Sequence, residues 1–275
     1  MFILVDTFAT FLDFWHSVNS KPTYAQIEAW AGEYLASWPE LLHKQVNEYA
    51  HDDLDWRQVA RERIFPYLKE RISTMRTAHR HLLKVLGPVS QAAQIRLGFT
   101  GQVTFVIYVG IGLGAGWATE YQAQPAVLFG LENIAELNWT QPETLSGLVA
   151  HELGHLYHAE LRKQHGRPTG SGPWWDLYSE GFAQRCENLI LGCQSWHMQY
   201  NEPLGEWLDW CQENLGWLAG RFEYCVQAGK SVNPFFGTWY EIQGHKQTGY
   251  YLGHEVIRHL EQRMSLEEIA LLERI

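Results

Sequence analysis

The sequence predicts an α+β protein that is mostly helical, with a small sheet placed before the helix that contains residues 151–155. Apolar residues recur at helical spacings of three and four from Tyr24 to about Leu86. The run Val103–Val109 is then rich in β-branched and aromatic residues, which is typical of a buried strand. Helical patterns return at Thr140 and continue to the C-terminus. Helices, a short sheet and further helices together indicate the α+β class.

Composition narrows the classes of partner. The 275 residues, 46% of them hydrophobic, are enough for one large core or two smaller ones. A formal net charge of −10 argues against a nucleic-acid partner, because affinity for phosphates comes mainly from Lys and Arg. The sequence contains no uninterrupted run of about 18 apolar residues, so it predicts no membrane-spanning helix. Asp6 and Asp13 interrupt the apolar N-terminus, so we expect folded structure there and not a signal peptide.

The four cysteines form no C-x-x-C pair and are too few for a disulfide framework. Reduced, buried thiols in a cytoplasmic protein are the expectation. The sequence does not indicate an oligomeric state.

Two regions are expected along the chain: a helical N-terminal region, residues 1–98, and one compact region, residues 99–275, that holds the candidate chemistry. Pro39 and Pro66 are expected to mark helix starts or breaks. Gly87-Pro88 is expected to close the last helix of the first region.

Glycines at alternate positions from Gly110 to Gly116 follow the first predicted strand. A dinucleotide-binding loop needs a helix directly after such glycines. Here the chain leads instead into a second predicted strand, Ala126–Leu131. A turn between two strands is therefore favoured over a nucleotide loop.

Later helices are expected at about residues 177–191, 205–228, 249–263 and 266–274. Gly192 is expected to end the first of them, with Asp176 as its N-cap. Ser265 and Glu268 form a capping-box pattern at the start of the last.

The motif with the most chemical meaning is His151-Glu152-Leu153-Gly154-His155, an HExxH sequence inside a predicted helix. Residues four apart in a helix lie about 40° apart around the axis and about 6 Å apart along it. Two imidazoles at this spacing converge on one Zn²⁺, and Glu152 reaches a metal-bound water from the side. A third ligand is then required.

Three downstream residues are candidates for the third ligand. His158 lies about 10 Å along the helix axis from His151, too far to share one ion, and we expect it at the surface or behind the ligands. His165 does not match the metzincin pattern, which needs a glycine at position 158. Glu180 begins a new helix after the Gly166–Pro173 turn, so the chain can reverse and bring this carboxylate back to the motif. We predict Glu180 as the third ligand.

The sequence resembles the gluzincin metallopeptidases, which pair HExxH with a downstream glutamate often set in an E-G-x-A context, as in Glu180–Ala183. The nearest resemblance is to the YjaZ-like predicted zinc proteases, the DUF2268 family, which share a late G-Y-x-x-G helix start matched by Gly249–Gly253. The similarity covers roughly residues 100–260. Twenty-four residues separate His155 from Glu180, more than in the thermolysin-like and aminopeptidase branches.

The resemblance implies a zincin-like fold and a zinc-dependent metallopeptidase that acts on a peptide or protein substrate. Zn²⁺ would be held by His151, His155 and Glu180, with a fourth position for water. Glu152 would act as the general base. In many zincins an edge strand beside the active helix binds the substrate, and the resemblance gives this role to Ala126–Leu131.

The tetrahedral oxyanion of such a reaction needs a donor. The G-Y-x-x-G resemblance makes Tyr250 the first choice, and the other candidates are Tyr240, His245 and Tyr251.

A second histidine pair, His254 and His259, does not form a metal motif. Its members are five residues apart, about 140° around a helix, and cannot chelate one ion together. We expect ordinary surface histidines there.

Two other functions use the same residues. One is a zinc-dependent hydrolase of a non-peptide amide or ester, and the other is a non-catalytic peptide-binding protein on the same fold. The presence of Glu152 favours catalysis, because an abandoned site is free to lose its base.

Overall fold

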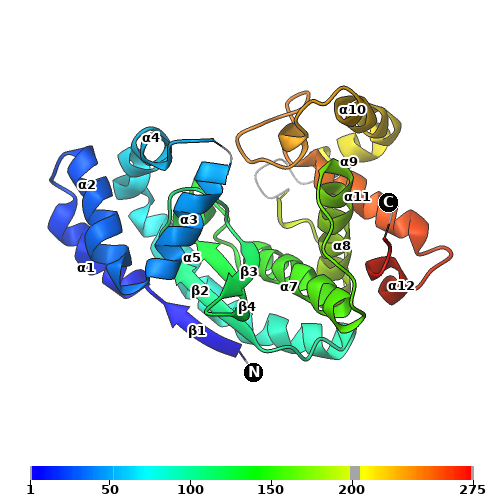
Figure 1. Ribbon diagram of the computed structural model, residues 1–275, viewed down its shortest axis with the longest axis horizontal. Helices are drawn as coiled ribbons and strands as arrows, with labels where there is room; N and C mark the ends of the chain where they lie inside the picture. The colour runs from blue at the N-terminus through cyan, green and yellow to red at the C-terminus, as the bar shows by residue number, and fades with distance from the viewer. Residues whose placement is uncertain (1, 52, 199–204, 274–275) are drawn as a thin grey trace. The chain divides into compact units, whose positions relative to one another are not determined.

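The structure is a computed structural model that describes residues 2–51, 53–198 and 205–273. It is mostly helical, with one four-stranded mixed sheet, as the α+β prediction requires (Figure 1). The chain forms two compact units. The first comprises Met1–Leu86 with Gln102–Leu145, and the second Gly87–Gly101 with Ser146–Ile275. The sequence analysis placed the first helices and the sheet on opposite sides of a boundary between residues 98 and 99. In the structure they lie in the same unit.

The sheet of the first unit has the strand order β1-β2-β4-β3. The two predicted strands are present as β2 (Val103–Tyr108), which is buried along its whole length, and β4 (Gln124–Gly130). The sequence analysis missed β1 (Phe2–Asp6), which pairs parallel with β2, and β3 (Trp117–Tyr121), which pairs antiparallel with β4.

The expectation that Ala126–Leu131 binds substrate as an edge strand is wrong. Strand β4 pairs with β2 on one side and with β3 on the other, so its backbone groups are already used. The edges of the sheet are β1 and β3.

The glycine-rich segment is a turn between β2 and β3, as predicted. Gly110 and Gly112 donate their backbone N–H groups to the buried carboxylate of Glu132, over 2.7 and 3.0 Å. Burial raises the pKa of Glu132 to about 7, against the opposite effect of these two hydrogen bonds. A Cβ atom at Gly110 would lie 2.5 Å from the Gln45 side chain, which explains a glycine there.

The helices of the first unit are short, apart from α5. They are α1 (Phe8–Val18), α2 (Thr23–Ala29), the π-helical turn η1 (Trp30–Tyr34), the 3-10 turn η2 (Leu35–Ser37), α3 (Pro39–His51), α4 (Trp56–Val59), the π-helical turn η3 (Ala60–Ile64), the start of α5 (Phe65–Leu97) and α6 (Leu131–Glu136). Pro39 begins α3, as expected of a proline at a helix start. Pro66 follows the π-helical turn η3, through which the helix continues without a break from α4 into α5, so it marks an irregularity in a helix and not a helix start.

Gly87-Pro88 does not end a helix. Helix α5 continues through Pro88 to Leu97, because Val89 and Ala93 are buried and their packing outweighs the one backbone hydrogen bond that proline removes. The Gly87 position instead coincides with the border between the two compact units.

The second unit contains the remaining helices. They are α7 (Pro142–Gln164), whose first residues belong to the first unit, α8 (Pro173–Leu191), α9 (Glu206–Glu213), α10 (Leu215–Gln227), the 3-10 turn η5 (Asn233–Phe235), α11 (Thr248–Leu260) and α12 (Leu266–Ala270). Gly192 ends α8 in the left-handed conformation, and Ser265 with Glu268 forms the predicted capping box of α12.

Three helix predictions need correction. The helix expected over 266–274 ends at Ala270, with Leu271 as its C-cap. The helix expected over 205–228 is divided at Asn214, the shared end of α9 and α10. Asp176 is not an N-cap, because α8 begins earlier, at Pro173, whose fixed φ suits the first turn of a helix. Asp176 therefore lies inside that turn.

Among the described residues, no helix combines the length and apolarity that a membrane crossing requires. Cys186, Cys211 and Cys225 are buried, as expected, whereas Cys193 is exposed.

Candidate metal centre

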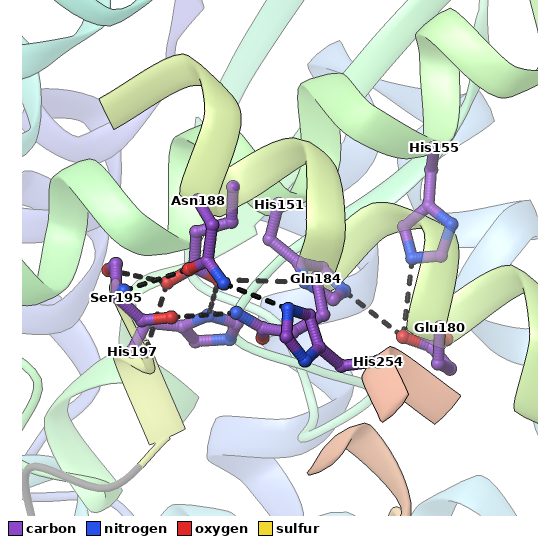
Figure 2. Close-up of polar contacts among 9 residues, drawn as sticks. His151, His155, Glu180, Gln184, Asn188, Ser195, His197 and His254 are labelled. Atoms are coloured by element: carbon purple, nitrogen blue, oxygen red, sulfur yellow. Dashed lines mark hydrogen bonds and ion pairs between the residues drawn. The ribbon is translucent and has the colours of Figure 1, made fainter. Parts of the chain in front are cut away.

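Three side chains of the second unit meet at one point. His151 and His155 extend from α7, and Glu180 extends from α8 and lies between the two imidazoles (Figure 2). The Oε2 atom of Glu180 is 3.0 Å from Nε2 of His151 and 3.3 Å from Nε2 of His155. The structure thus brings together the three residues that the sequence predicted as ligands.

The spacing of these atoms suits one zinc ion. A tetrahedral site with metal–ligand bonds of 2.0–2.1 Å places its ligand atoms about 3.3 Å apart. The two distances to Glu180 lie close to this value. Two imidazole nitrogens and one carboxylate oxygen are also a donor set that zinc takes in catalytic sites.

Glycines let the supporting helices approach closely. On α7, a Cβ atom at Gly154 would lie 3.0 Å from the Ala183 backbone of α8. On the other side of α8, a Cβ atom at Gly181 would overlap the backbone of Gly253 in α11. The small residues of the E-G-x-A and G-Y-x-x-G segments therefore set the distances at which Glu180 reaches the histidines.

The three groups depend on one another electrostatically. Burial alone would raise the pKa of Glu180, but attraction to His155 and hydrogen bonds from both histidines outweigh it and hold that pKa well below its usual range. Burial would lower the pKa of His155, yet the Glu180 carboxylate raises it to about 9. Without a metal ion, Glu180 and His155 form an ion pair.

The open side of the site is the side of Glu180 and His155. Their side chains are 26% and 19% exposed, against 3% for His151. A ligand from solution can therefore reach the point between them, as a catalytic metal site requires. The Ser179 hydroxyl lies 3.4 Å from Nδ1 of His155 and supports that ring from behind.

Glu152, which follows His151 on α7, is buried. Its negative charge raises the pKa of His155 and of Tyr250, so its carboxylate lies close enough to both residues to affect their titration.

Of the four candidate donors for an oxyanion, the structure brings Tyr250 to the site. Its ring centre is 5.5 Å from that of His151, and burial, with the charges of Glu180 and Glu152, raises its pKa well above the usual value. Tyr251 packs instead among tryptophans, His245 stacks on Trp210, and Tyr240 is 48% exposed.

The sequence analysis missed a second cluster on the other side of His151. Nδ1 of His151 is 3.7 Å from Oε2 of Glu187, and the same oxygen is 2.7 Å from Nδ1 of His197. His151, Glu187 and His197 are all buried and form a second group with the donor types of a metal site. A signal for Glu187 was present, because Glu180, Gln184 and Glu187 follow one another at helical spacing on α8.

The structure buries two other histidines. His254 is not at the surface but buried, with Nε2 3.1 Å from the Asn188 amide (Figure 2). Its Nδ1 is 3.0 Å from Glu255. His158 is also buried, against the aromatic rings of Trp175, Tyr178 and Phe182. Burial lowers the pKa of His158 to about 3, so this histidine is neutral.

Comparisons of the chain with protein-family profiles, with curated proteins and with solved structures find no match. The chemistry of the site is therefore inferred from its own residues and not from a relative. Buried histidines and glutamates in this unit have the types and the spacing to hold a metal ion.

Proposed function

We propose that the protein is a zinc-dependent metallopeptidase of the gluzincin type, with a zincin-like arrangement of its second unit. The observation that carries the proposal is that His151, His155 and Glu180 meet on a partly exposed side of the site, with Oε2 of Glu180 3.0 Å and 3.3 Å from the two imidazole nitrogens, close to the edge length of a zinc tetrahedron. A structural zinc site is closed by a fourth protein ligand, whereas a catalytic site keeps one position open.

When bound, Zn²⁺ supplies a Lewis acid that activates water and polarises a carbonyl group. The chain's own residues do the rest. Glu152 accepts a proton from the attacking water and passes it to the leaving amine. The hydroxyl of Tyr250 donates a hydrogen bond to the developing oxyanion.

The first experiment measures metal content by elemental mass spectrometry on protein purified without a metal-affinity tag. Wild type and Glu152→Gln are expected to carry one zinc per chain, and Glu180→Ala to lose it. Wild type that contains no zinc and takes none up would overturn the proposal.

The second experiment measures hydrolysis of a mixture of unstructured peptides, with mass spectrometry of the products. Wild type is expected to cleave peptide bonds, and Glu152→Gln to be at least about 100-fold slower with the same zinc content. Cleavage only of small amides or esters would make the protein a non-peptide hydrolase. Zinc binding without any turnover would indicate a binding protein.

A further inference from the structure

Two candidate metal groups share His151, and the imidazole has one nitrogen for each. Nε2 lies 3.0 Å from Glu180, and Nδ1 lies 3.7 Å from Glu187. The geometry of Glu187 decides whether the second group holds a metal ion or supports the first.

Glu187 is already occupied by hydrogen-bond donors. Its Oε1 accepts from the Ser195 hydroxyl over 2.6 Å and from the backbone N–H of His197 over 3.2 Å. Its Oε2 is 2.7 Å from Nδ1 of His197, a hydrogen-bond distance well short of the edge of a zinc tetrahedron. A carboxylate has about four acceptor positions, so three are used and one remains.

The remaining position lies beside a buried nitrogen that needs an acceptor. Nδ1 of His151 is buried, and it has no hydrogen-bond partner among the residues that the structure describes. When Nε2 of a histidine binds a metal, Nδ1 carries the proton and becomes a donor. The Glu187 side chain is fully buried, and its Oε2 is 3.7 Å away, so a shift of less than 1 Å completes a hydrogen bond.

Helix α7 makes room for this cluster. Gly147 lies one turn before His151, and a Cβ atom there would lie 2.8 Å from both Oε1 of Glu187 and Cβ of His197. The helix has no side chain at the point where Glu187 and His197 approach it.

We propose that Glu187 is a positioning residue that accepts the Nδ1–H of His151 and so presents Nε2 to the metal ion, and that it is not itself a metal ligand. The inference rests on the metal site of the proposed function, although not on its catalysis. Glu187 thereby couples the segment of Ser195 and His197 to the metal centre.

The test compares zinc affinity, by competition with a chromophoric chelator, in wild type, Glu187→Gln and Ser195→Ala. Glu187→Gln is expected to bind one zinc per chain about 10–100-fold more weakly, as is typical when the hydrogen-bond partner of a ligand histidine is lost. Ser195→Ala is the matched control, since it removes a 2.6 Å hydrogen bond from Oε1 of the same carboxylate, whereas Oε2 is the oxygen near His151. It is expected to change the affinity less than twofold.

Equal losses of zinc affinity in the two variants would overturn the proposal, because they would mean that Glu187 acts only through the general stability of the cluster. Unchanged affinity in Glu187→Gln would also overturn it. So would a fall from two zinc ions to one, which would make Glu187 a ligand of a second ion.

A second measurement needs no variant. In the zinc-loaded wild-type protein, nitrogen-15 NMR of the histidine rings is expected to show His151 bound through Nε2, with a hydrogen-bonded proton on Nδ1. Coordination through Nδ1, or no zinc binding at all, would contradict the proposal. A protein that has this proton and binds zinc but cleaves no peptide would refute the proposed function and leave the role of Glu187 intact.

Discussion

The two sides of His151 present the same kinds of residue in different states. Glu180 and Glu187 both lie on α8, and each contacts a further histidine. The Glu180 carboxylate is 26% exposed and is contacted by two imidazoles at zinc-like distances, whereas Glu187 is fully buried and its oxygens already accept three hydrogen bonds. Residue type and proximity alone do not distinguish a ligand from its support. The two roles are distinguished by the number of hydrogen bonds that the carboxylate already accepts and by its access from solution.

The largest expected effect separates the two outer histidines. His155→Gln removes one of three proposed ligands and is expected to weaken zinc binding by more than about 1,000-fold, beyond the range of an outer hydrogen-bond partner. His197→Gln is expected to weaken it less than about 10-fold. Isothermal titration with Zn²⁺ measures both. Comparable losses in the two variants would break the distinction between the sides of His151.

The open side is tested at Tyr250. Tyr250→Phe removes the hydroxyl and keeps the ring packed near His151. We expect kcat to fall about 100- to 1,000-fold, with KM and zinc affinity nearly unchanged, because the donor acts on the transition state. Peptide hydrolysis kinetics provide the measurement. A rise in KM alone would assign Tyr250 to substrate binding.

The buried side of His151, where Glu187 and His197 lie, is tested by a change in the packing of α7. Gly147→Ala places a methyl group against Glu187 and His197, and the free energy of unfolding is expected to fall by about 1–3 kcal/mol. At Gly220, on α10, an added Cβ atom would meet no described atom within 4 Å outside the neighbouring helix backbone, so Gly220→Ala is expected to leave stability equal or up to about 1 kcal/mol higher. Urea unfolding of both variants gives the comparison. If Gly147→Ala behaves like Gly220→Ala, the cluster does not restrict α7.

The smallest effect concerns His158, a buried histidine of α7 that packs against aromatic rings. The pKa of His158 falls from 6.5 to about 3 on folding, so below pH 6.5 the unfolded chain binds a proton that the folded chain does not. This contribution to stability is complete above pH 6.5 and is lost as the pH falls towards 3, by at most about 1.4 kcal/mol per pH unit.

His158→Gln is therefore expected to show a shallower loss of stability between pH 6.5 and pH 4.5 than wild type, whatever its stability at neutral pH. Chemical unfolding at a series of pH values measures the two slopes. Equal slopes would mean that His158 is not held neutral.

Much of the local structure was predictable. The strand at Val103–Tyr108, the helix start at Pro39 and the capping box at Ser265 all follow from short-range patterns, and all are present. The errors occurred where packing overrides a local signal. Pro88 does not break α5, because the buried face of the helix continues past it.

The sequence by itself determined the HExxH helix and the pair of imidazoles on one face, because a spacing of four residues is a property of the helix alone. It also indicated Glu180, through a turn and a helix start. Only the tertiary structure decided that β1 joins the sheet beside β2, that Gly181 meets Gly253, and that Glu187 lies behind His151. These contacts join segments far apart along the chain, and their distances come from how closely helices and strands pack, which no local periodicity encodes.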